Sequence, residues 1–559
     1  MTLDILFLHP PATYDFRKKV QFPGPVAQTV HHSSPQFIVF PVGLLSIADY
    51  LDRHGYSTHI ANLGESMLSS SDFDVEDYIK KVESRVYAVE MHWCVHVQGS
   101  IEIARICKKY HPNALVILGG LTATCFHNEI VRNYTFVDAV IRGEAEEATL
   151  ELAQKMNAPN GMRDVPNLTY RDRGNRLRAN PQRKPVADLD EFEFTRLDLV
   201  SPKRLSLGTV ESWSIPLCRG CTRNCVTCGG SAHAYRTLCG RERPALRSPA
   251  RVVEDIKRLE EQGIRHVFLF QDPRDCGEKY WRKLFELIRA EKPLDIALTF
   301  ELFSPANDEY LRSLSKVDCD IRLTISPESG DESVRRTHGR EYSNEELRLT
   351  MQLCQKYRVP LAVFFMVGLS SETRQTIRKT WEIIEDISRL GPGLVSNVGP
   401  MISLDPGSLA FDFPREHGYR LFFRTLEDYR QAAGMPSWHQ WISYETHSLA
   451  RHEISDLALQ SLVFLLHSWK KYDLDRLDQV SLSSALFDIS SNYIIFEEVD
   501  RILQFRNPQE VEVRLKDLKA SVEDCRNRAW SNTGGRADPY GYRRELSKVV
   551  HRSIDLMHG

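Results

Sequence analysis

The order of apolar and polar positions divides the first 155 residues into alternating strands and helices. Five short apolar runs predict buried strands, at 5–8, 58–63, 87–91, 115–118 and 137–141. The apolar spacing predicts two amphipathic helices, at 44–54 and 101–110. Strands separated by helices predict a parallel, doubly wound sheet whose ligands lie beyond the carboxyl ends of the strands. We therefore expect an α/β domain of flavodoxin or Rossmann type over residues 1–155.

The same alternation returns between residues 204 and 404. Apolar runs predict strands at 267–270, 297–302, 321–325 and 361–367, with helices such as 251–262 between them. This pattern is typical of a partial parallel (β/α)6 barrel with its active site at the carboxyl ends of the strands.

Two further regions complete the predicted organisation. Residues 156–203 form a linker with a hairpin, 167–170 against 176–178, turned at Gly174-Asn175. Residues 405–559 have a helical period, clearest at 457–470 and 511–522, and we expect a helical domain that lids the barrel. A cluster of mostly aromatic residues precedes that helical part: Trp438, His439, Trp441 and Tyr444. Their spacing is typical of core residues, and contact with the substrate is the alternative.

Composition narrows the class of partner. The net charge is -3 and basic and acidic residues are mixed along the chain, so no phosphate-tracking surface is indicated and we expect no nucleic acid partner. No secretory signal opens the chain, and the longest apolar run, 359–369, has about half the length that spans a bilayer. Twelve cysteines without a paired framework are typical of a reducing compartment. We expect a cytoplasmic monomer that does not contact a membrane.

Four cysteines lie within eleven residues, and three of them carry the most specific signal in the chain. Cys221, Cys225 and Cys228 have the spacing Cys-x3-Cys-x2-Cys, with Cys218 just before them. Thiolates are the ligands of iron-sulfur clusters, and three of them on a four-iron cluster leave one iron open to another ligand. A structural zinc site is the first alternative, but the two Cys-x2-Cys pairs of a zinc ribbon are usually separated by roughly 15 or more residues. Plain structural thiols are the second.

Polar and glycine residues follow several predicted strands. Gly119-Gly120 and Gly143-Glu144 end two strands of the first domain, where glycine permits close backbone approach of a ligand. The same turns also occur as plain geometry. No Gly-x-Gly-x-x-Gly run is present, which argues against a dinucleotide site.

The cysteine spacing resembles the cluster loop of the radical SAM enzymes, in which the fourth iron binds the amino and carboxylate groups of S-adenosylmethionine. Thr227 departs from the aromatic residue usual before the last cysteine. The order of domains resembles the cobalamin-binding branch of that family, in particular the subgroup that includes the tryptophan 2-C-methyltransferase of thiopeptide biosynthesis. The segments that carry this resemblance are Phe7 to Pro11, Tyr14 to Arg17, Asp72 to Glu76, Met91-His92-Trp93, Gly119-Gly120 and Arg142-Gly143-Glu144.

The resemblance implies three cofactors and a set of residues for each. Cys221, Cys225 and Cys228 would hold a [4Fe-4S] cluster and would be the catalytic and metal-binding residues. Cobalamin would be bound by residues of the first domain, namely Ser69, His92, Trp93, Gly119, Gly120, Thr122, Gly143 and Glu144. S-adenosyl-L-methionine would be bound by residues at the barrel strand ends, namely Gln271, Asp272, Glu301, Ser326, Glu328, Arg340 and Gly368. Asp272 has a second implied role, as a carboxylate that caps the fourth iron.

The lower face of the cobalt is predicted to lack a histidine. The first loop has no Asp-x-His-x-x-Gly motif, and His96 to Gly99 supplies only its second half, with Cys94 in place of the aspartate. We interpret His96 as an ordinary loop or helix-start histidine. The tryptophan enzyme is thought to bring an arginine from the segment that matches Met67 to Asp74, where this chain offers Ser69; water or an apolar face is the expected substitute.

The resemblance implies a cobalamin-dependent radical SAM C-methyltransferase. It would move a methyl group from S-adenosylmethionine, through methylcobalamin, to a carbon of a small aromatic or heteroaromatic natural-product precursor. An external flavodoxin- or ferredoxin-type protein would supply electrons. Radical and polar methyl transfer both stay open. A cyclase or oxidoreductase with the same cofactors is one alternative, and a non-enzymatic cobalamin or iron-sulfur sensor is another.

Overall fold

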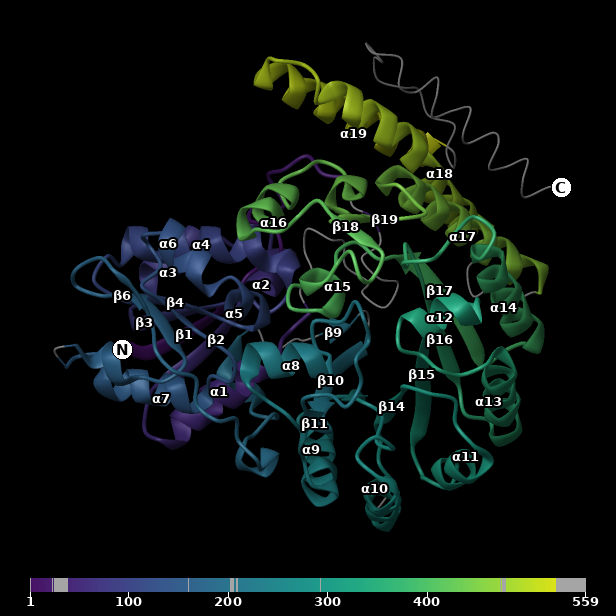
Figure 1. Cartoon of the computed structure of the whole chain (residues 1–559), viewed down its shortest axis with the longest axis horizontal. Helices are drawn as coiled ribbons and strands as arrows, with labels where there is room; N and C mark the ends of the chain where they lie inside the picture. Colours follow the sequence, from purple (N-terminus) through teal and green to yellow (C-terminus); the bar gives the residue numbers. More distant parts are fainter. Residues whose placement is uncertain are drawn as a thin grey trace.

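The computed structural model describes residues 2–22, 24, 39–158, 160–201, 206–207, 210–291, 293–472, 474 and 479–528. Two large sheets with helices on their faces lie side by side, and a region of helices and short strands lies along their upper edge in Figure 1. No helix of the described part is both long and apolar enough to cross a lipid bilayer.

The first sheet has a parallel centre with the strand order β5-β4-β3-β1-β2, which is the flavodoxin order. Its strands are β1 (Leu3–His9), β2 (Thr58–Asn62), β3 (Ser84–Glu90), β4 (Leu115–Gly119) and β5 (Ala139–Ile141). The strand order reverses between β1 and β3, so the crevice at their carboxyl ends is where such a sheet binds a ligand. The predicted doubly wound fold is confirmed.

Alternation along β1 places side chains on both faces of this sheet. Ile5 and Phe7 pack in one core with helices α1 and α7, whereas Leu6 and Leu8 pack in another with α3, α4 and α6. Helices on both faces make the sheet doubly wound. The helices of this domain are α1 (Gly43–Arg53), α2 (Leu63–Ser69), α3 (Val75–Lys81), α4 (Val97–Tyr110), α5 (Leu121–Cys125), α6 (His127–Asn133) and α7 (Glu146–Lys155).

The predicted hairpin forms, but it belongs to the first sheet. β6 (Leu168–Arg171) pairs antiparallel with β5, and β7 (Leu177–Ala179) pairs with β6. β8 (Val200–Ser201) joins the opposite edge by pairing with β2. The segment predicted as a linker therefore adds strands to both edges of the sheet, which local pattern could not reveal because the partners are distant in sequence.

The second sheet is a partial barrel of six parallel strands in chain order. They are β10 (Val210–Pro216), β13 (His266–Phe270), β14 (Ala297–Leu302), β15 (Asp320–Glu328), β16 (Leu361–Val367) and β17 (Leu394–Pro400). A two-residue strand, β9 (Ser206–Leu207), pairs antiparallel with β10. The connecting helices are α8 (Ala232–Cys239), α9 (Pro249–Glu261), α10 (Glu278–Ala290), α11 (Asp308–Leu314), α12 (Glu332–Thr337), α13 (Asn344–Tyr357) and α14 (Ile377–Leu390).

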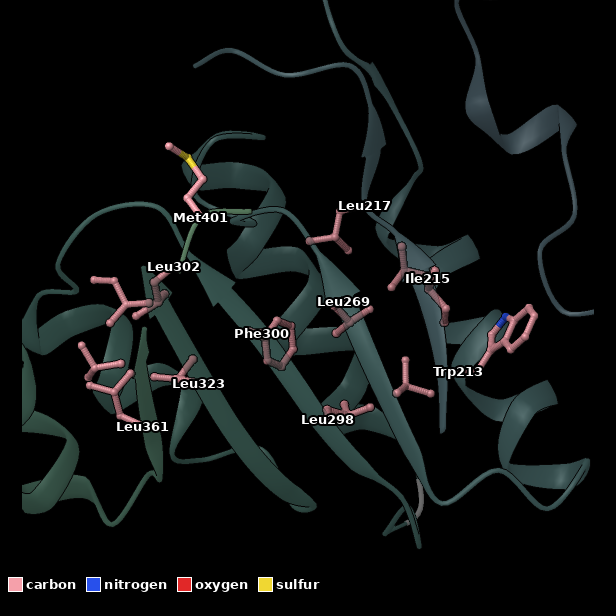
Figure 2. Packing of buried hydrophobic residues seen from close by; sticks show 14 of the residues in the cluster. Trp213, Ile215, Leu217, Leu269, Leu298, Phe300, Leu302, Leu323, Leu361 and Met401 are labelled. Atoms are coloured by element: carbon pink, nitrogen blue, oxygen red, sulfur yellow. The ribbon is translucent and has the colours of Figure 1, made fainter. Parts of the chain in front are cut away.

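Burial alternates along the barrel strands and separates two faces. Leu298, Phe300 and Leu302 of β14 are buried, and Phe300 meets Phe285 of α10 with ring centroids 5.6 Å apart, so this face packs against the helices. Figure 2 shows part of this core, with Phe300 of β14 between Leu323 of β15 and Leu269 of β13. Most of the alternate positions are partly buried or exposed, and they face the barrel interior. They include Phe268, Phe270, Glu301, Thr324, Ser326, Phe364, Met366 and Asn397.

The remaining described residues pack on the barrel and on the first domain. Helix α17 lies against β17 and α14, and α18 and α19 follow it outward. Trp438, Trp441 and Tyr444 are buried in the main core, which supports the core interpretation of these aromatics. The elements are α15 (Leu409–Asp412), β18 (Tyr419–Leu421), α16 (Leu426–Ala432), β19 (Tyr444–Thr446), α17 (Arg451–Lys471), α18 (Gln479–Ile502) and α19 (Pro508–Arg528).

Candidate cofactor sites

The three-cysteine loop follows β10, the first barrel strand. Cys221 and Cys225 are half-buried and Cys228 is exposed, and all three are free thiols. The backbone N–H of Arg223 donates to Cys221 Sγ and that of Gly230 donates to Cys228 Sγ, each at 3.3 Å. N–H groups directed at sulfur stabilise the thiolate form, which is the form that binds metal. The loop therefore fits an iron-sulfur cluster.

Side chains from outside the loop hold it in place. Asp275 accepts from Arg223 at 2.7 and 2.8 Å and from the Thr222 hydroxyl at 3.0 Å. Asp405, which follows β17, accepts from the backbone N–H of Gly229 at 2.9 Å. Both ends of the loop are thus tied to other strand ends of the barrel.

Cys218 lies apart from this arrangement. It is buried in the two-residue strand β11 (Cys218–Arg219), which pairs antiparallel with β12 (Ala245–Leu246). The neighbouring thiol of Cys276, and then burial, raise the pKa of Cys218 far above its ordinary value. Cys218 thus lies in a ribbon outside the three-cysteine loop, and its bystander role stays a prediction.

Charged side chains at the barrel mouth lie next to the cluster loop. Arg340 pairs with Glu328 at 3.2 Å, and Glu301 accepts from the backbone N–H of Gln271 at 3.0 Å. Burial raises the pKa of both Glu301 and Glu328. Glu328 Oε2 and Arg340 Nε are buried without a hydrogen-bond partner among the described residues. Orphaned buried polar atoms of both signs fit a ligand that carries an amine and a carboxylate.

Asp272 is engaged in a different way from its neighbours. It is fully buried, pairs with Arg274 at 2.5 Å and accepts from the backbone N–H of Phe303 at 2.9 Å. A capping role at the iron would require Arg274 to release one of these oxygens. With its amide nitrogen turned towards the acceptors, the Gln271 side chain donates to the carbonyl oxygens of Phe270 and Cys218.

The end of β16 adds a buried acid. The backbone N–H of Gly368 donates to Glu372 Oε2 at 2.7 Å, whereas Glu372 Oε1 has no partner in the part of the chain that the structure describes. Burial raises the pKa of Glu372 to about 8, so this carboxyl is protonated at neutral pH. Ser326, one strand away on β15, is half-buried on the interior face. These groups border the same barrel mouth as Glu328.

The switch point of the first sheet carries a buried polar cluster. Glu90, at the end of β3, accepts from His9 Nδ1–H at 3.1 Å, from His96 Nδ1–H at 3.2 Å and from the backbone N–H of His92 at 2.7 Å. His9 and His96 are fully buried. His96 is a helix-start histidine at the N-cap of α4, as one of the two expected interpretations had it, and it also belongs to this buried network. Because this network fixes the chain before His92, the half-buried His92 and Trp93 have a defined place at the sheet edge.

Gly120 is required for protein packing at this edge. Its φ is +113°, and a Cβ there would lie 2.7 Å from both the N and Cα atoms of His92. Thr122 also holds His92, because its N–H and hydroxyl donate to the His92 carbonyl at 3.1 and 2.9 Å. A Cβ on Gly119 would meet one atom of the described residues within 4 Å, the carbonyl oxygen of Ile141 at 3.7 Å. Of the two glycines, Gly119 is therefore the one with room for a ligand.

Gly143 and Glu144 lie at the boundary between the two sheets. A Cβ on Gly143 would lie 3.3 Å from Cys239 Cα of α8. Glu144 pairs with Arg241 at 2.5 Å and with Arg219 at 3.5 Å. The structure therefore places these two residues against the barrel, just beyond Ile141, the β5 residue that pairs with Gly119. Their cofactor contact stays a prediction.

Ser69 ends helix α2 and donates to Glu65 Oε1 at 3.0 Å. An arginine does reach this neighbourhood, from the first loop: Arg17 donates to the carbonyl oxygens of Ser70, Ser71 and Phe73. Asp15 pairs with the same guanidinium at 3.0 Å. The arginine is fully used by these contacts.

The two candidate sites meet at a segment that the sequence did not single out, residues 401–405. Ser403 Oγ lies 3.3 Å from Cys94 Sγ of the first domain, and Asp405 reaches the cluster loop as described above. The one local signal was the Asp405-Pro406-Gly407 sequence, which is typical of a turn. Its partners are far away in the sequence, so spacing alone could not find them.

Similarity to known proteins agrees with this geometry. Residues 215–384 match the Radical SAM superfamily and residues 30–153 match the B12 binding domain. An uncharacterised methyltransferase of Pyrococcus horikoshii is 22% identical over 68% of this chain and 77% of its own length. An anaerobic magnesium-protoporphyrin IX monomethyl ester cyclase of Rubrivivax gelatinosus is 23% identical over 62% of each chain.

Solved structures share the architecture. The radical S-adenosylmethionine methyltransferase TsrM of Kitasatospora setae, with tryptophan and a SAM analogue bound, has a TM-score of 0.57 at 15% identity, covering 84% of this chain and 89% of that one. The cobalamin-dependent radical enzyme OxsB has a TM-score of 0.58 at 12% identity, covering 99% and 84%.

The cysteine loop on a partial barrel, beside a flavodoxin-order sheet, identifies the class. The chain combines a radical SAM domain with a B12 binding domain. Its cofactors are a [4Fe-4S] cluster, S-adenosylmethionine and cobalamin.

Proposed function

We propose that the protein is a C-methyltransferase that moves a methyl group from S-adenosylmethionine to a carbon of a small aromatic or heteroaromatic precursor. The observation that carries the proposal is the contact of the segment 401–405 with both domains, through Cys94 on one side and Gly229 on the other. Methyl transfer by way of a corrin requires the S-adenosylmethionine site of the barrel and the cobalamin site of the first domain to face one another. The contact of residues 401–405 with both domains supports that arrangement.

The residues proposed for each site would act as follows. When bound, the cluster supplies electrons for cleavage of S-adenosylmethionine and cobalamin carries a methyl group. Cys221, Cys225 and Cys228 would hold the cluster. Arg340 would bind the carboxylate of S-adenosylmethionine, and its partner Glu328 would bind an amine or hydroxyl group. The partly apolar interior face with Phe268 and Phe364 would exclude water from the reacting groups.

A panel of aromatic acceptors with S-adenosylmethionine that carries a deuterated methyl group tests the proposal. Mass spectrometry of the products is expected to find the three deuterium atoms on an acceptor carbon. Stoichiometric 5'-deoxyadenosine would support the radical path, and its absence during turnover would remove that path.

A cyclase is the second candidate, because several relatives of similar identity carry that name. The same experiment separates the two. A product that is cyclised or oxidised but free of label favours the cyclase. A cytoplasmic monomer that takes electrons from a flavodoxin- or ferredoxin-type protein remains part of the proposal.

A further inference from the structure

Asp405 stands at the place where the cluster loop and the first domain come together. It follows β17 by five residues, at the carboxyl end of the barrel, and its Oδ2 accepts from the backbone N–H of Gly229 at 2.9 Å. A Cβ on Gly229 would lie 2.7 Å from the Asp405 Cβ, so the aspartate packs directly on the loop beside Cys228. Only a residue fixed in this way can have a defined distance to the cluster.

The backbone around Asp405 is also held from the other sides. Leu404 is fully buried; its N–H donates to Ser443 Oγ at 3.0 Å and its carbonyl accepts from the Tyr429 hydroxyl at 3.1 Å. Ser403 contacts Cys94, which lies four residues beyond the end of β3 in the first domain. Asp405 therefore sits between the cluster loop and the sheet edge that carries His92.

The carboxylate of Asp405 has binding capacity that the protein does not use. An ionised carboxylate offers about four lone-pair sites, and the contact with Gly229 fills one of them. The other oxygen, Oδ1, accepts no hydrogen bond from the described residues, and none of their cations pairs with it. The Asp405 side chain is half-buried, so Oδ1 is open to a ligand. A donor group on a ligand would supply what is missing.

We propose that Asp405 contacts the methyl acceptor and holds it through a hydrogen bond from the acceptor to Oδ1. This inference rests on the proposed methyl transfer and narrows its substrate class to ring compounds that bear an N–H or O–H donor. The donor would orient the ring between the cluster loop and the corrin, and the rest of the ring would contact the interior face of the barrel.

Binding of matched ring probes to the holoenzyme tests the inference without knowledge of the natural acceptor. Indole is compared with benzofuran, which has the same shape without the N–H, and phenol is compared with anisole. The wild type is expected to bind at least one donor probe about tenfold or more tightly than its partner, because only the donor probe can form the hydrogen bond to Oδ1. Equal binding within both pairs, or no binding of any probe, overturns the inference.

The variant Asp405→Asn assigns the preference to this residue. Asparagine keeps the size of the side chain and an acceptor for the Gly229 N–H, so iron content and the cluster EPR signal are expected to match the wild type. The preference for the donor probe is expected to fall about tenfold, because a neutral acceptor replaces a charged one. Asp386→Asn, on the outer surface of α14, is the matched control and should leave the preference unchanged.

The outcomes separate this inference from the proposed function. A preserved preference in Asp405→Asn, or a loss of iron in that variant, shows that Asp405 serves the loop alone and overturns the inference. Methyl label that never reaches any acceptor in the wild type overturns the proposed function instead.

Discussion

At the scale of single residues, cluster binding depends on which cysteine sulfur atoms act as iron ligands. We predict that alanine at Cys221, Cys225 or Cys228 abolishes cluster binding, because each removes one of three ligands. Cys218→Ala is the control, since Cys218 lies beside Cys276 in a separate two-stranded ribbon. Iron and sulfide analysis with absorption near 400 nm checks the set; a full cluster in any of the first three variants would contradict the assignment.

Glu372 provides a prediction about pH. Burial raises its pKa from 4.5 to about 8, so the folded protein binds a proton there that the unfolded chain releases above pH 4.5. Its contribution to stability is therefore present at low pH and is lost as the pH rises towards 8, with a slope of at most about 1.4 kcal/mol per pH unit. Glu372→Gln should remove this slope. Denaturant unfolding of both proteins between pH 6 and 8.5 measures it, and identical pH profiles would refute the assignment.

Residue chemistry was predictable from sequence only where partners are close along the chain. The three cysteines lie within eight residues, so their spacing identified the cluster loop. Asp405 contacts Gly229 across 176 residues, and Glu90 meets His9 across 81, so no local pattern could pair them. The partners of Glu144 were missed for the same reason, because Arg241 comes from the other domain.

At the scale of elements, the edge of the first sheet depends on the close contact of two turns. Gly120→Ala is predicted to destabilise the protein by on the order of 3 kcal/mol and to weaken cobalamin binding, because the added Cβ would collide with the backbone of His92 at a positive φ. Gly43→Ala, where a Cβ meets nothing within 4 Å, is the control. Thermal unfolding and corrinoid titration measure the two effects. Equal behaviour of both variants would contradict this account of the edge.

The strands were predictable because apolar runs of four to seven residues must be buried between helices. The predicted strand at 297–302 matches β14 residue for residue, and 361–367 matches β16. β15 extends three residues beyond its apolar run, to Glu328, because a register shift carries it past Ile325. The placement of the hairpin and of β8 in the first sheet depends on distant backbone pairing, which side-chain pattern does not encode.

At the scale of the whole molecule, buried ion pairs join the two sheets. Arg219 of the barrel pairs with Glu146 of α7 at 2.6 Å, and Arg241 pairs with Glu144 at 2.5 Å. Glu146→Gln removes the negative charge that balances the largely buried Arg219. Removal of one partner of a buried ion pair typically lowers the free energy of unfolding by about 3–5 kcal/mol. We predict earlier unfolding and faster proteolysis between the domains. Glu278→Gln, at an exposed ion pair with Arg282 on α10, is the control, and no difference between the variants would exclude this coupling.

The most direct test of the central claim follows one methyl group through the enzyme. Anaerobically reconstituted protein with reduced cobalamin is mixed with S-adenosylmethionine that carries a 13C-labelled methyl group, and the corrinoid is extracted and analysed by mass spectrometry. The account predicts labelled methyl on the corrinoid together with an equal amount of S-adenosylhomocysteine. Unlabelled corrinoid, with the label found only in methionine beside 5'-deoxyadenosine, would contradict it.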